Sequence, residues 1–228
     1  MRAIVLVVLF AAPAMAQQQA ARQAAPIDIT GQWVAFVTED WRFRMMTPPK
    51  GDYTRVPLTP EGRKAADAWN PAADQAAGNA CKAYGVGGIM RIPGRLRISW
   101  QDDMTLRIES DAGMQTRTLR FAASAPSAAP TWQGDSRARW DVANRSLRVS
   151  TTNFRSGYLR RNGVPYSENA VITEHFDVAP HPQGGQLLVV TTVVEDPRYL
   201  LRPFIVSSHF KQEKDGSRWN PQPCVAVW

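Results

Sequence analysis

The sequence predicts an all-β protein that folds as a single up-and-down antiparallel barrel with a short helical insertion. Three observations support this prediction: apolar and polar residues alternate with a period of two, turn-forming residues separate these segments at short intervals, and helical signals are confined to one stretch. A hydrophobic share of 44% is enough for one core, and a chain of 228 residues does not require a second domain.

The N-terminal segment, residues 1–16, has the composition of a cleavable signal peptide. Arg2 gives a positive start, residues 4–10 are apolar, and Ala14-Met15-Ala16 supplies small residues for cleavage. The apolar run is shorter than the roughly 20 residues that span a bilayer, so no transmembrane segment is expected. The mature protein is predicted to be periplasmic or secreted, with residues 17–26 as a flexible lead and residues 27–228 as the barrel domain.

The first strand is predicted over residues 31–46, either as one long strand or as two strands with a bend. The alternation places Trp33, Val37, Glu39, Trp41 and Phe43 on the inward face. The strand pattern stops at a turn-rich loop that begins at residue 47.

Residues 59–78 interrupt the strand pattern and predict two short helices. Thr59-Pro60 and Asn70-Pro71 each pair a capping residue with a proline in the first turn. A glycine-rich segment, residues 84–88, follows and is predicted to be flexible. The insertion could be a lid over one mouth of the barrel or a structural plug, and the sequence leaves both open.

From residue 89 onward the chain reads as strand after strand, with an Ala/Ser/Pro-rich connection at residues 122–130. The strands fall at residues 95–100, 106–109, 116–121, 136–142, 146–152, 170–178, 187–195 and 204–212. Their number and spacing favour a closed barrel or a sandwich.

Two groups of residues carry a family resemblance. Residues 28–34, Asp-Ile-Thr-Gly-Gln-Trp-Val, place Gly-x-Trp ahead of an alternating strand, and a second group extends toward the C-terminus. Its members are Trp140, Leu147, Val149, Thr151, Thr152, Asn153, Phe154, Gly163, Pro165, Ser167, Glu168, Glu174, Phe176, Glu195, Asp196, Pro197, Pro203 and Phe204. The chain resembles the calycin barrels, and among them a group of exported, lipocalin-like bacterial proteins that mostly lack an assigned function. The resemblance implies a barrel that encloses a small molecule.

Two cysteines, Cys81 and Cys224, are the only ones in the sequence. Export permits a disulfide between them, which would fasten the C-terminal tail to the body of the protein. Two free thiols or a shared metal are the alternatives.

Several function classes are not expected. The sequence has no nucleotide-binding, dinucleotide-binding, hydrolase or zinc-protease motif, so no cofactor is predicted. His175 and Asp177 share a strand face that is predicted to be exposed, so no metal site is predicted. The net charge is +7, but the basic residues are spread along strands and form no basic run, so nucleic-acid binding is not expected either.

Candidate catalytic residues are carboxylates on apolar strand faces. Glu39 and Glu174 are predicted to point inward, where burial raises a carboxyl pKa and suits it to general acid or base catalysis. A structural ion pair with an inward arginine such as Arg117 is the alternative. His209 and Tyr166 are secondary catalytic candidates.

Candidate ligand-binding residues are mainly aromatic, which favours flat ligands. They are Trp33, Trp41, Phe43, Arg44, Trp100, Trp140, Tyr158 and Phe176. The leading hypothesis is a binding protein for a small, largely apolar molecule, aromatic or polycyclic, in the barrel lumen. One alternative is a cofactor-independent enzyme, a lyase, isomerase, hydratase or ring-opening enzyme that uses its buried carboxylates. Another is an envelope interaction module with a basic outer face.

Overall fold

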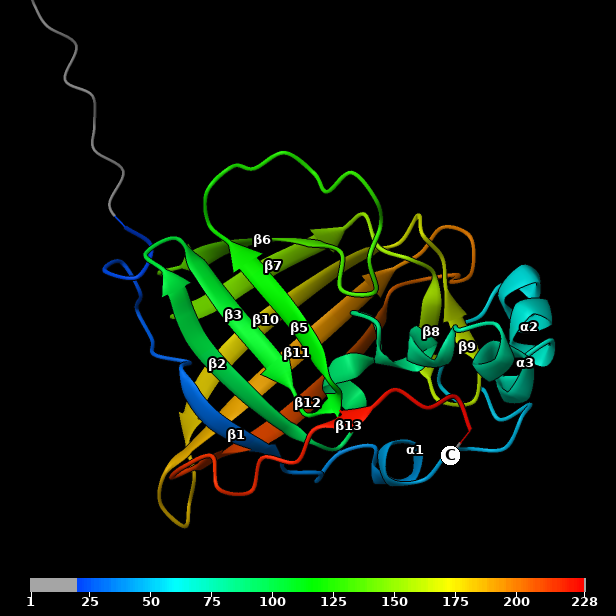
Figure 1. The fold of residues 1–228 in the computed structure, drawn as a ribbon, viewed down its shortest axis with the longest axis horizontal. Helices are drawn as coiled ribbons and strands as arrows, with labels where there is room; N and C mark the ends of the chain where they lie inside the picture. The colour runs from blue at the N-terminus through cyan, green and yellow to red at the C-terminus, as the bar shows by residue number, and fades with distance from the viewer. Residues whose placement is uncertain (1–19, 228) are drawn as a thin grey trace, which may run out of the picture.

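A closed barrel of nine strands is the main feature of the computed structural model, which describes residues 20–227 (Figure 1). The predicted signal peptide lies outside the described residues. In order around the barrel, the strands are β1 (Gly31–Ala35), β12 (Phe204–Glu213), β11 (Gln186–Glu195), β10 (Val171–Pro180), β7 (Ser146–Thr152), β6 (Asp135–Asp141), β5 (Gln115–Arg120), β3 (Thr105–Ser110) and β2 (Arg95–Asp102). Pairing of β1 with both β12 and β2 closes the barrel.

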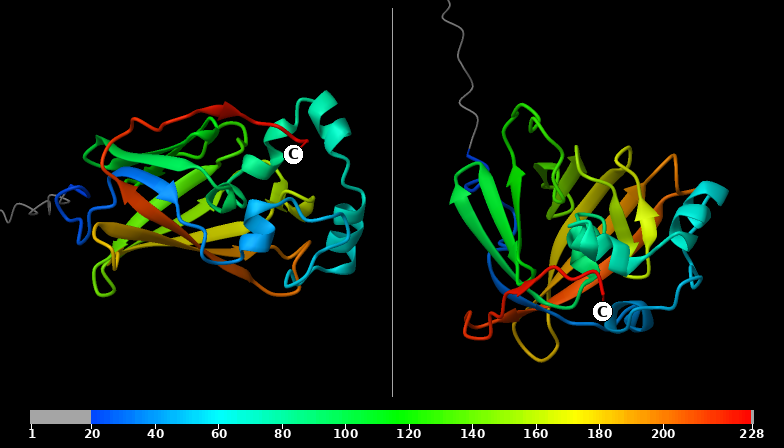
Figure 2. Two further views of the ribbon diagram at one scale, coloured as in Figure 1. Left: turned by 90° about the horizontal axis from the view of Figure 1, so that it is seen from below. Right: turned by 45° about the vertical axis from the view of Figure 1, so that its right-hand side comes forward.

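The other elements gather mainly toward one end of the barrel, which we call the closed end (Figures 1 and 2). They are α1 (Trp41–Met45), α2 (Pro60–Asp67), α3 (Pro71–Ala76), the 3-10 helices η1 (Ala80–Tyr84) and η2 (Ile89–Arg91), the pair β4 (Ala112–Gly113) and β13 (Gln222–Pro223), and the pair β8 (Gly157–Arg160) and β9 (Val164–Tyr166). We call the opposite end, where residues 20–30 approach the barrel, the open end.

The strand directions differ from the prediction at one place. Neighbouring barrel strands run antiparallel except β5 and β6, which pair in parallel at Leu119–Ser136 and Arg120–Arg137. The barrel is therefore mixed, and a purely up-and-down antiparallel barrel is not confirmed. The reason is the connection over residues 121–134, which leads from the end of β5 back toward the closed end, so that β6 repeats the direction of β5 (Figure 1).

The barrel interior is filled by side chains. Those buried in this core include Trp33, Leu96, Ile98, Leu106, Ile108, Leu119, Leu147, Val149, Phe176, Leu188, Val190 and Phe210. Burying one such side chain contributes roughly 1.5–3 kcal/mol to folding. A ligand in the middle of the lumen would have to displace these groups, so the ends of the barrel are the places to look for a site.

The first strand is shorter than predicted. It ends at Ala35, and residues 41–45 form α1 instead of a second strand segment. The prediction that Trp41 faces inward is wrong, because its side chain is 62% exposed. Adjacent Phe43 and Arg44 are both buried, which alternation in a strand does not allow. Asp40, with φ of 52°, turns the chain just before the helix.

The predicted helices and their caps are present in the insertion. Thr59 Oγ1 accepts a hydrogen bond from the Gly62 amide at 3.0 Å, and Asn70 Oδ1 accepts one from the Ala73 amide at 3.1 Å. After the insertion, Ile89 of η2 packs within the barrel core, while residues of the insertion and of the loop before it form a second core with β8, β9 and β12. Packing of this kind favours the structural plug over the lid, the two alternatives that the sequence left open.

Residues 84–88, predicted to be flexible, are tightly packed. Tyr84 and Val86 are buried. A Cβ on Gly88 would lie 2.6 Å from the carbonyl oxygens of Ala83 and Tyr158, a distance that real Cβ atoms do not reach. Glycine is therefore needed here because two backbone segments approach each other closely. A glycine-rich sequence looks the same whether its glycines serve close packing or a flexible hinge.

The disulfide between Cys81 and Cys224 is present, as predicted, with the two Cα atoms 5.1 Å apart. It joins η1 to the C-terminal tail, 143 residues later in the chain. A disulfide indicates a non-reducing compartment. Within residues 20–227, no helix has the length and apolar character needed to span a membrane.

Candidate ligand-binding site

A cleft of about 450 Å³ lies at the open end of the barrel, between the N-terminal lead and the ends of β2, β3 and β6. Trp100 and Trp140 contribute two of its walls, and Leu106 extends it toward the barrel core. Ile27, the residue after the lead, also lines the cleft. We call this space the open-end cleft.

Three aromatic rings form a cluster beside this cleft. The ring centroids of Trp100 and Phe121 are 5.7 Å apart, and those of Phe121 and Trp140 are 5.3 Å apart. The rings of Trp100 and Trp140 are tilted by 54° to each other. Such a cluster offers ring faces and edges to which a flat apolar ligand can pack.

The N-terminal lead is held against the barrel by specific contacts. The indole Nε1 of Trp140 donates to the carbonyl oxygen of Ala21 at 2.7 Å, and the Arg22 amide donates to the carbonyl oxygen of Asp103 at 3.1 Å. Ala21 is buried. Residues 20–26, predicted as part of a flexible lead, thus form one wall of the open-end cleft.

The polar lining of the open-end cleft carries a surplus of positive charge. Arg22 and Arg145 line it together with a single carboxylate, that of Asp28. The Asp28 Oδ1 atom accepts hydrogen bonds from the amide and the hydroxyl of Thr30, at 2.8 and 2.7 Å. The two guanidinium groups would therefore favour a ligand that carries a negative group.

Glu174, predicted as a buried carboxylate, lies inside the barrel beside Arg117. Its Oε2 atom accepts a hydrogen bond from Arg117 Nη2, and the two side chains are 0% and 3% exposed. The same arginine donates to Ser136 Oγ at 2.8 Å and to Thr151 Oγ1 at 2.7 Å. A carboxylate paired in this way and cut off from solvent fits the structural alternative. A ligand could reach it only after the core opened.

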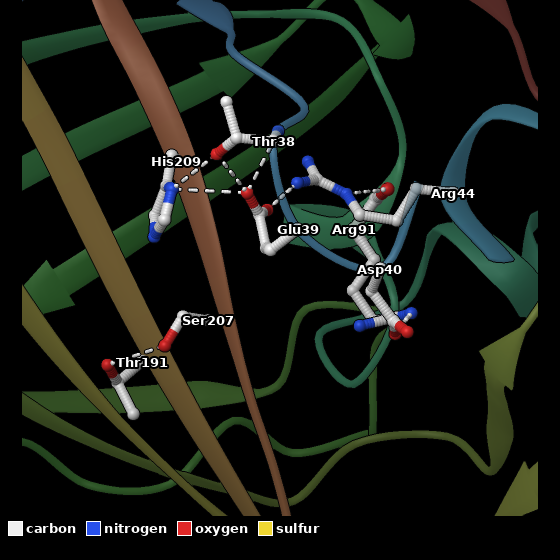
Figure 3. A network of polar contacts seen from close by, with 8 residues as sticks. All are labelled: Thr38, Glu39, Asp40, Arg44, Arg91, Thr191, Ser207 and His209. Atoms are coloured by element: carbon white, nitrogen blue, oxygen red, sulfur yellow. Dashed lines mark hydrogen bonds and ion pairs between the residues drawn. The ribbon is translucent and has the colours of Figure 1, made fainter. Parts of the chain in front are cut away.

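Glu39 and His209, which were predicted separately as catalytic candidates, are in contact (Figure 3). Glu39 Oε2 lies 3.1 Å from His209 Nδ1, and its Oε1 accepts from Arg44. Glu39 belongs to the loop after β1 and is partly exposed, so the prediction that it faces the lumen is wrong. His209 is at an odd position of β12, and the side chains at odd positions of that strand point away from the core. Its contact with Glu39 therefore places this loop over the outer side of β12.

Tyr166 is fully buried in β9, where its ring packs edge-on against Phe154 with centroids 5.5 Å apart. Burial raises the pKa of its phenol well above the usual value. A phenol that stays protonated and is shielded from solvent anchors the packing of β9, and its position offers no access to a ligand.

The remaining predicted ligand-binding residues divide by position. Trp33 and Phe176 are core residues of the barrel and are fully buried. Tyr158 lies at the closed end, where its hydroxyl donates to Asp74 Oδ2 at 2.6 Å. Phe43 and Arg44 are also at the closed end, while Trp41 is exposed on α1. Of the set, the structure places Trp100 and Trp140 at the open-end cleft.

Sequence reasoning missed the contribution of Arg22, Ile27 and Arg145 to the cleft. Arg22 and Ile27 come from a segment with no strand or helix periodicity, so their position depends on contacts with distant residues. Arg145 is the last residue of the turn between β6 and β7, and its φ of 52° cannot be read from the local sequence pattern.

No group of three His, Cys, Asp or Glu side chains among residues 20–227 could hold a metal ion. Comparisons of the chain with family models, curated proteins and solved structures found no match. The fold therefore defines the class of protein, a closed and disulfide-bonded β-barrel with a plugged end, and the chemistry must be argued from its clefts.

Proposed function

We propose that this protein is an exported, lipocalin-like binding protein that holds a small, largely apolar molecule, aromatic or polycyclic, at the open end of its barrel. The observation that carries the proposal is the open-end cleft, about 450 Å³ in volume, with Trp100 and Trp140 in its walls. The disulfide and the signal-like N-terminal sequence support export.

The size of the binding energy indicates which ligands would suit this cleft. Burial of about 200 Å² of apolar ligand surface contributes roughly 5 kcal/mol, but the loss of translational and rotational freedom on binding costs about 4 kcal/mol or more. Ring packing against Trp100 and Trp140 supplies about 1 kcal/mol more. Apolar packing alone is therefore not enough for tight binding, and a negative group on the ligand, paired with Arg22 or Arg145, would add about 1.5–3 kcal/mol.

The test is to mix the oxidised protein with a library of aromatic, terpenoid and lipid metabolites and to measure the bound and free pools by mass spectrometry. We expect a compound to be retained unchanged. Trp100→Leu should weaken its binding at least tenfold, while Trp132→Leu, which removes a ring stacked on Arg155 at 3.9 Å, serves as the matched control. Equal affinity in the Trp100 variant would place the ligand elsewhere and refute the proposal.

A second candidate function rests on the contact between Glu39 and His209. A carboxylate and an imidazole 3.1 Å apart, with side chains 22% and 28% exposed, can exchange protons with a bound molecule. This arrangement would suit a cofactor-independent lyase, isomerase, hydratase or ring-opening enzyme. A library compound that is consumed with formation of a product, and a Glu39→Gln variant that binds it without turnover, would favour this function over simple binding.

A further inference from the structure

A second cleft, of about 360 Å³, lies at the closed end of the barrel beside the first half of β12. It exists because β1 is short: β1 pairs with β12 from Phe210 to Glu213, so the preceding residues of β12 have no β1 neighbour. Phe204, Ile205 and Val206 of β12 form its apolar wall, and Arg55 and Arg160 form a polar one. We call this space the arginine cleft.

Charges around the arginine cleft are unequal. Two carboxylates line it, and each is engaged by an arginine behind the wall: Glu39 by Arg44, and Asp40 by Arg91 at 2.7 Å (Figure 3). A third nearby carboxylate, that of Asp52, pairs with Arg42 at 2.6 Å. The two arginines that line the cleft therefore lack equivalent partners: among the described residues, Arg160 forms no ion pair, and Arg55 reaches Asp40 only at 4.0 Å.

Arg160 is the more constrained of these two arginines. It is 4% exposed, its guanidinium lies 4.0 Å above the ring of Phe43, and its Nη1 donates to the carbonyl oxygen of Thr54 at 2.9 Å. Its Nε has no hydrogen-bond partner within the part of the chain that the structure describes. Burial, together with the nearby charge of Arg91, lowers the pKa of Arg160 to about 10. A buried cation with an unused donor is costly unless an anion accepts from it.

Backbone conformation at this cleft is unusual at two positions. Asp40 and Arg55 both have left-handed conformations, with φ of 52° and 67°. Such a conformation costs a non-glycine residue roughly 1–2 kcal/mol, and residues that adopt it cluster at ligand-binding positions. Here the two conformations place a carboxylate and a guanidinium on the same cleft.

We propose that the arginine cleft binds the carboxylate of a small apolar molecule. The guanidinium groups of Arg160 and Arg55 donate to the carboxylate oxygens, and Phe204 and Val206 pack against the apolar body. A planar guanidinium matches a carboxylate in shape, and the apolar wall distinguishes such a ligand from a simple inorganic anion. This site lies at the opposite end of the barrel from the open-end cleft, so the inference does not depend on the proposed function.

The test is calorimetric titration of the oxidised protein with sodium benzoate, benzyl alcohol and inorganic phosphate in parallel. Benzoate should bind at least tenfold more tightly than either of the other two probes, because only benzoate has both a carboxylate and an apolar ring. Binding of phosphate as tight as that of benzoate would overturn the proposal, as would failure of benzoate to bind.

Variants locate the benzoate. Arg55→Gln should weaken binding at least fivefold and Arg160→Met at least tenfold, whereas Arg139→Gln, the same kind of change at an exposed position of β6, should have no effect. Because the Arg55 side chain is 77% exposed, its variant keeps the test valid if Arg160→Met fails to fold. Benzoate binding that is lost in Trp100→Leu but unchanged in Arg55→Gln would refute this site while supporting the open-end cleft.

Discussion

The two ends of the barrel are built in different ways. The closed end has a disulfide, a plug of short helices and a second apolar core, whereas the contacts of the lead at the open end include two hydrogen bonds made by Ala21 and Arg22. From this difference we expect the closed end to open less readily than the open end. Among the described residues, the open end has neither a disulfide nor a second apolar core, and its N-terminal segment is held by hydrogen bonds such as those of Ala21 and Arg22 and by the buried side chain of Ile29.

The charged groups of the molecule show a related difference. Arg117 in the barrel interior has a carboxylate and two hydroxyl groups as partners, while Arg160 at the closed end has no carboxylate partner among the described residues. A buried charge that the chain itself balances holds strands together. A buried charge that has no opposite charge from the chain indicates where a ligand can supply one.

The largest effect is expected at the disulfide. Replacing Cys81 and Cys224 by serine removes a link between residues 143 positions apart, which the chain-entropy model values at about 4–5 kcal/mol. Urea unfolding followed by tryptophan fluorescence would measure the loss, with the reduced wild-type protein as the matched comparison. A loss below about 1 kcal/mol would show that the closed end is held by its apolar core alone.

The ion pair inside the barrel should come next. Glu174→Gln leaves Arg117 charged and buried without its carboxylate, which costs about 3–5 kcal/mol. Replacing both residues by methionine should recover most of this loss, because Ser136 and Thr151 still bond to each other at 2.9 Å. If the double variant is as unstable as Glu174→Gln, the ion pair itself stabilises the fold, beyond each residue neutralising the buried charge of the other.

Much of the fold could be predicted from the sequence, because alternation over long strands and capping at helix starts are local properties. The strands at β10, β11 and β12 and the caps at Thr59 and Asn70 follow from such patterns. The direction of β6 and the end of β1 do not. The direction of β6 depends on where the long connection after β5 leads. The end of β1 depends on ion pairs such as that between Arg44 and Glu39, whose apolar neighbours in the sequence suggested a strand.

The site was harder to predict than the fold. Trp100 and Trp140 were predicted as ligand-binding residues because aromatic side chains on the inward faces of strands favour flat ligands, and the structure places both at the open-end cleft. The lead was missed as a wall, since its position comes from contacts with Asp103 and Trp140, which are distant in sequence. The excess of arginine over carboxylate at the closed end could not be predicted, because Asp40, Arg55, Arg91 and Arg160 are far apart in the sequence and meet only in the fold.

A smaller effect is expected at the open end. Trp140→Phe keeps a ring in the aromatic cluster but removes the Nε1 donor to Ala21, which should cost about 1 kcal/mol. Hydrogen exchange should increase for amides of residues 20–30 and stay unchanged around η1. A variant that instead lowers the stability of the whole barrel as much as loss of the disulfide would contradict the contrast between the two ends.

The smallest effect concerns Asp177, which lines a further cleft at the open end together with Arg145. Burial raises the pKa of its carboxyl; the charge of His175 opposes this rise and that of Asp141 adds to it. The folded protein thus holds this proton more tightly than the unfolded chain, so stability falls as pH rises from about 3.8 through the raised pKa. Because the group is half-buried, the change is expected to be below about 0.5 kcal/mol.

Asp177→Asn removes a contribution that falls with pH, so the change in urea midpoint from pH 3.5 to pH 6 should be more favourable in the variant than in the wild-type protein. Asp141 offers a matched control of opposite sign, because hydrogen bonds from Asn144 lower the pKa of its carboxyl. Its stabilising contribution is present above the unfolded-state pKa and is lost as pH falls through the lowered value, so Asp141→Asn should lower stability near neutral pH. If both variants shift the pH profile in the same direction, solvent screening at the open end outweighs the local environments of these two carboxylates.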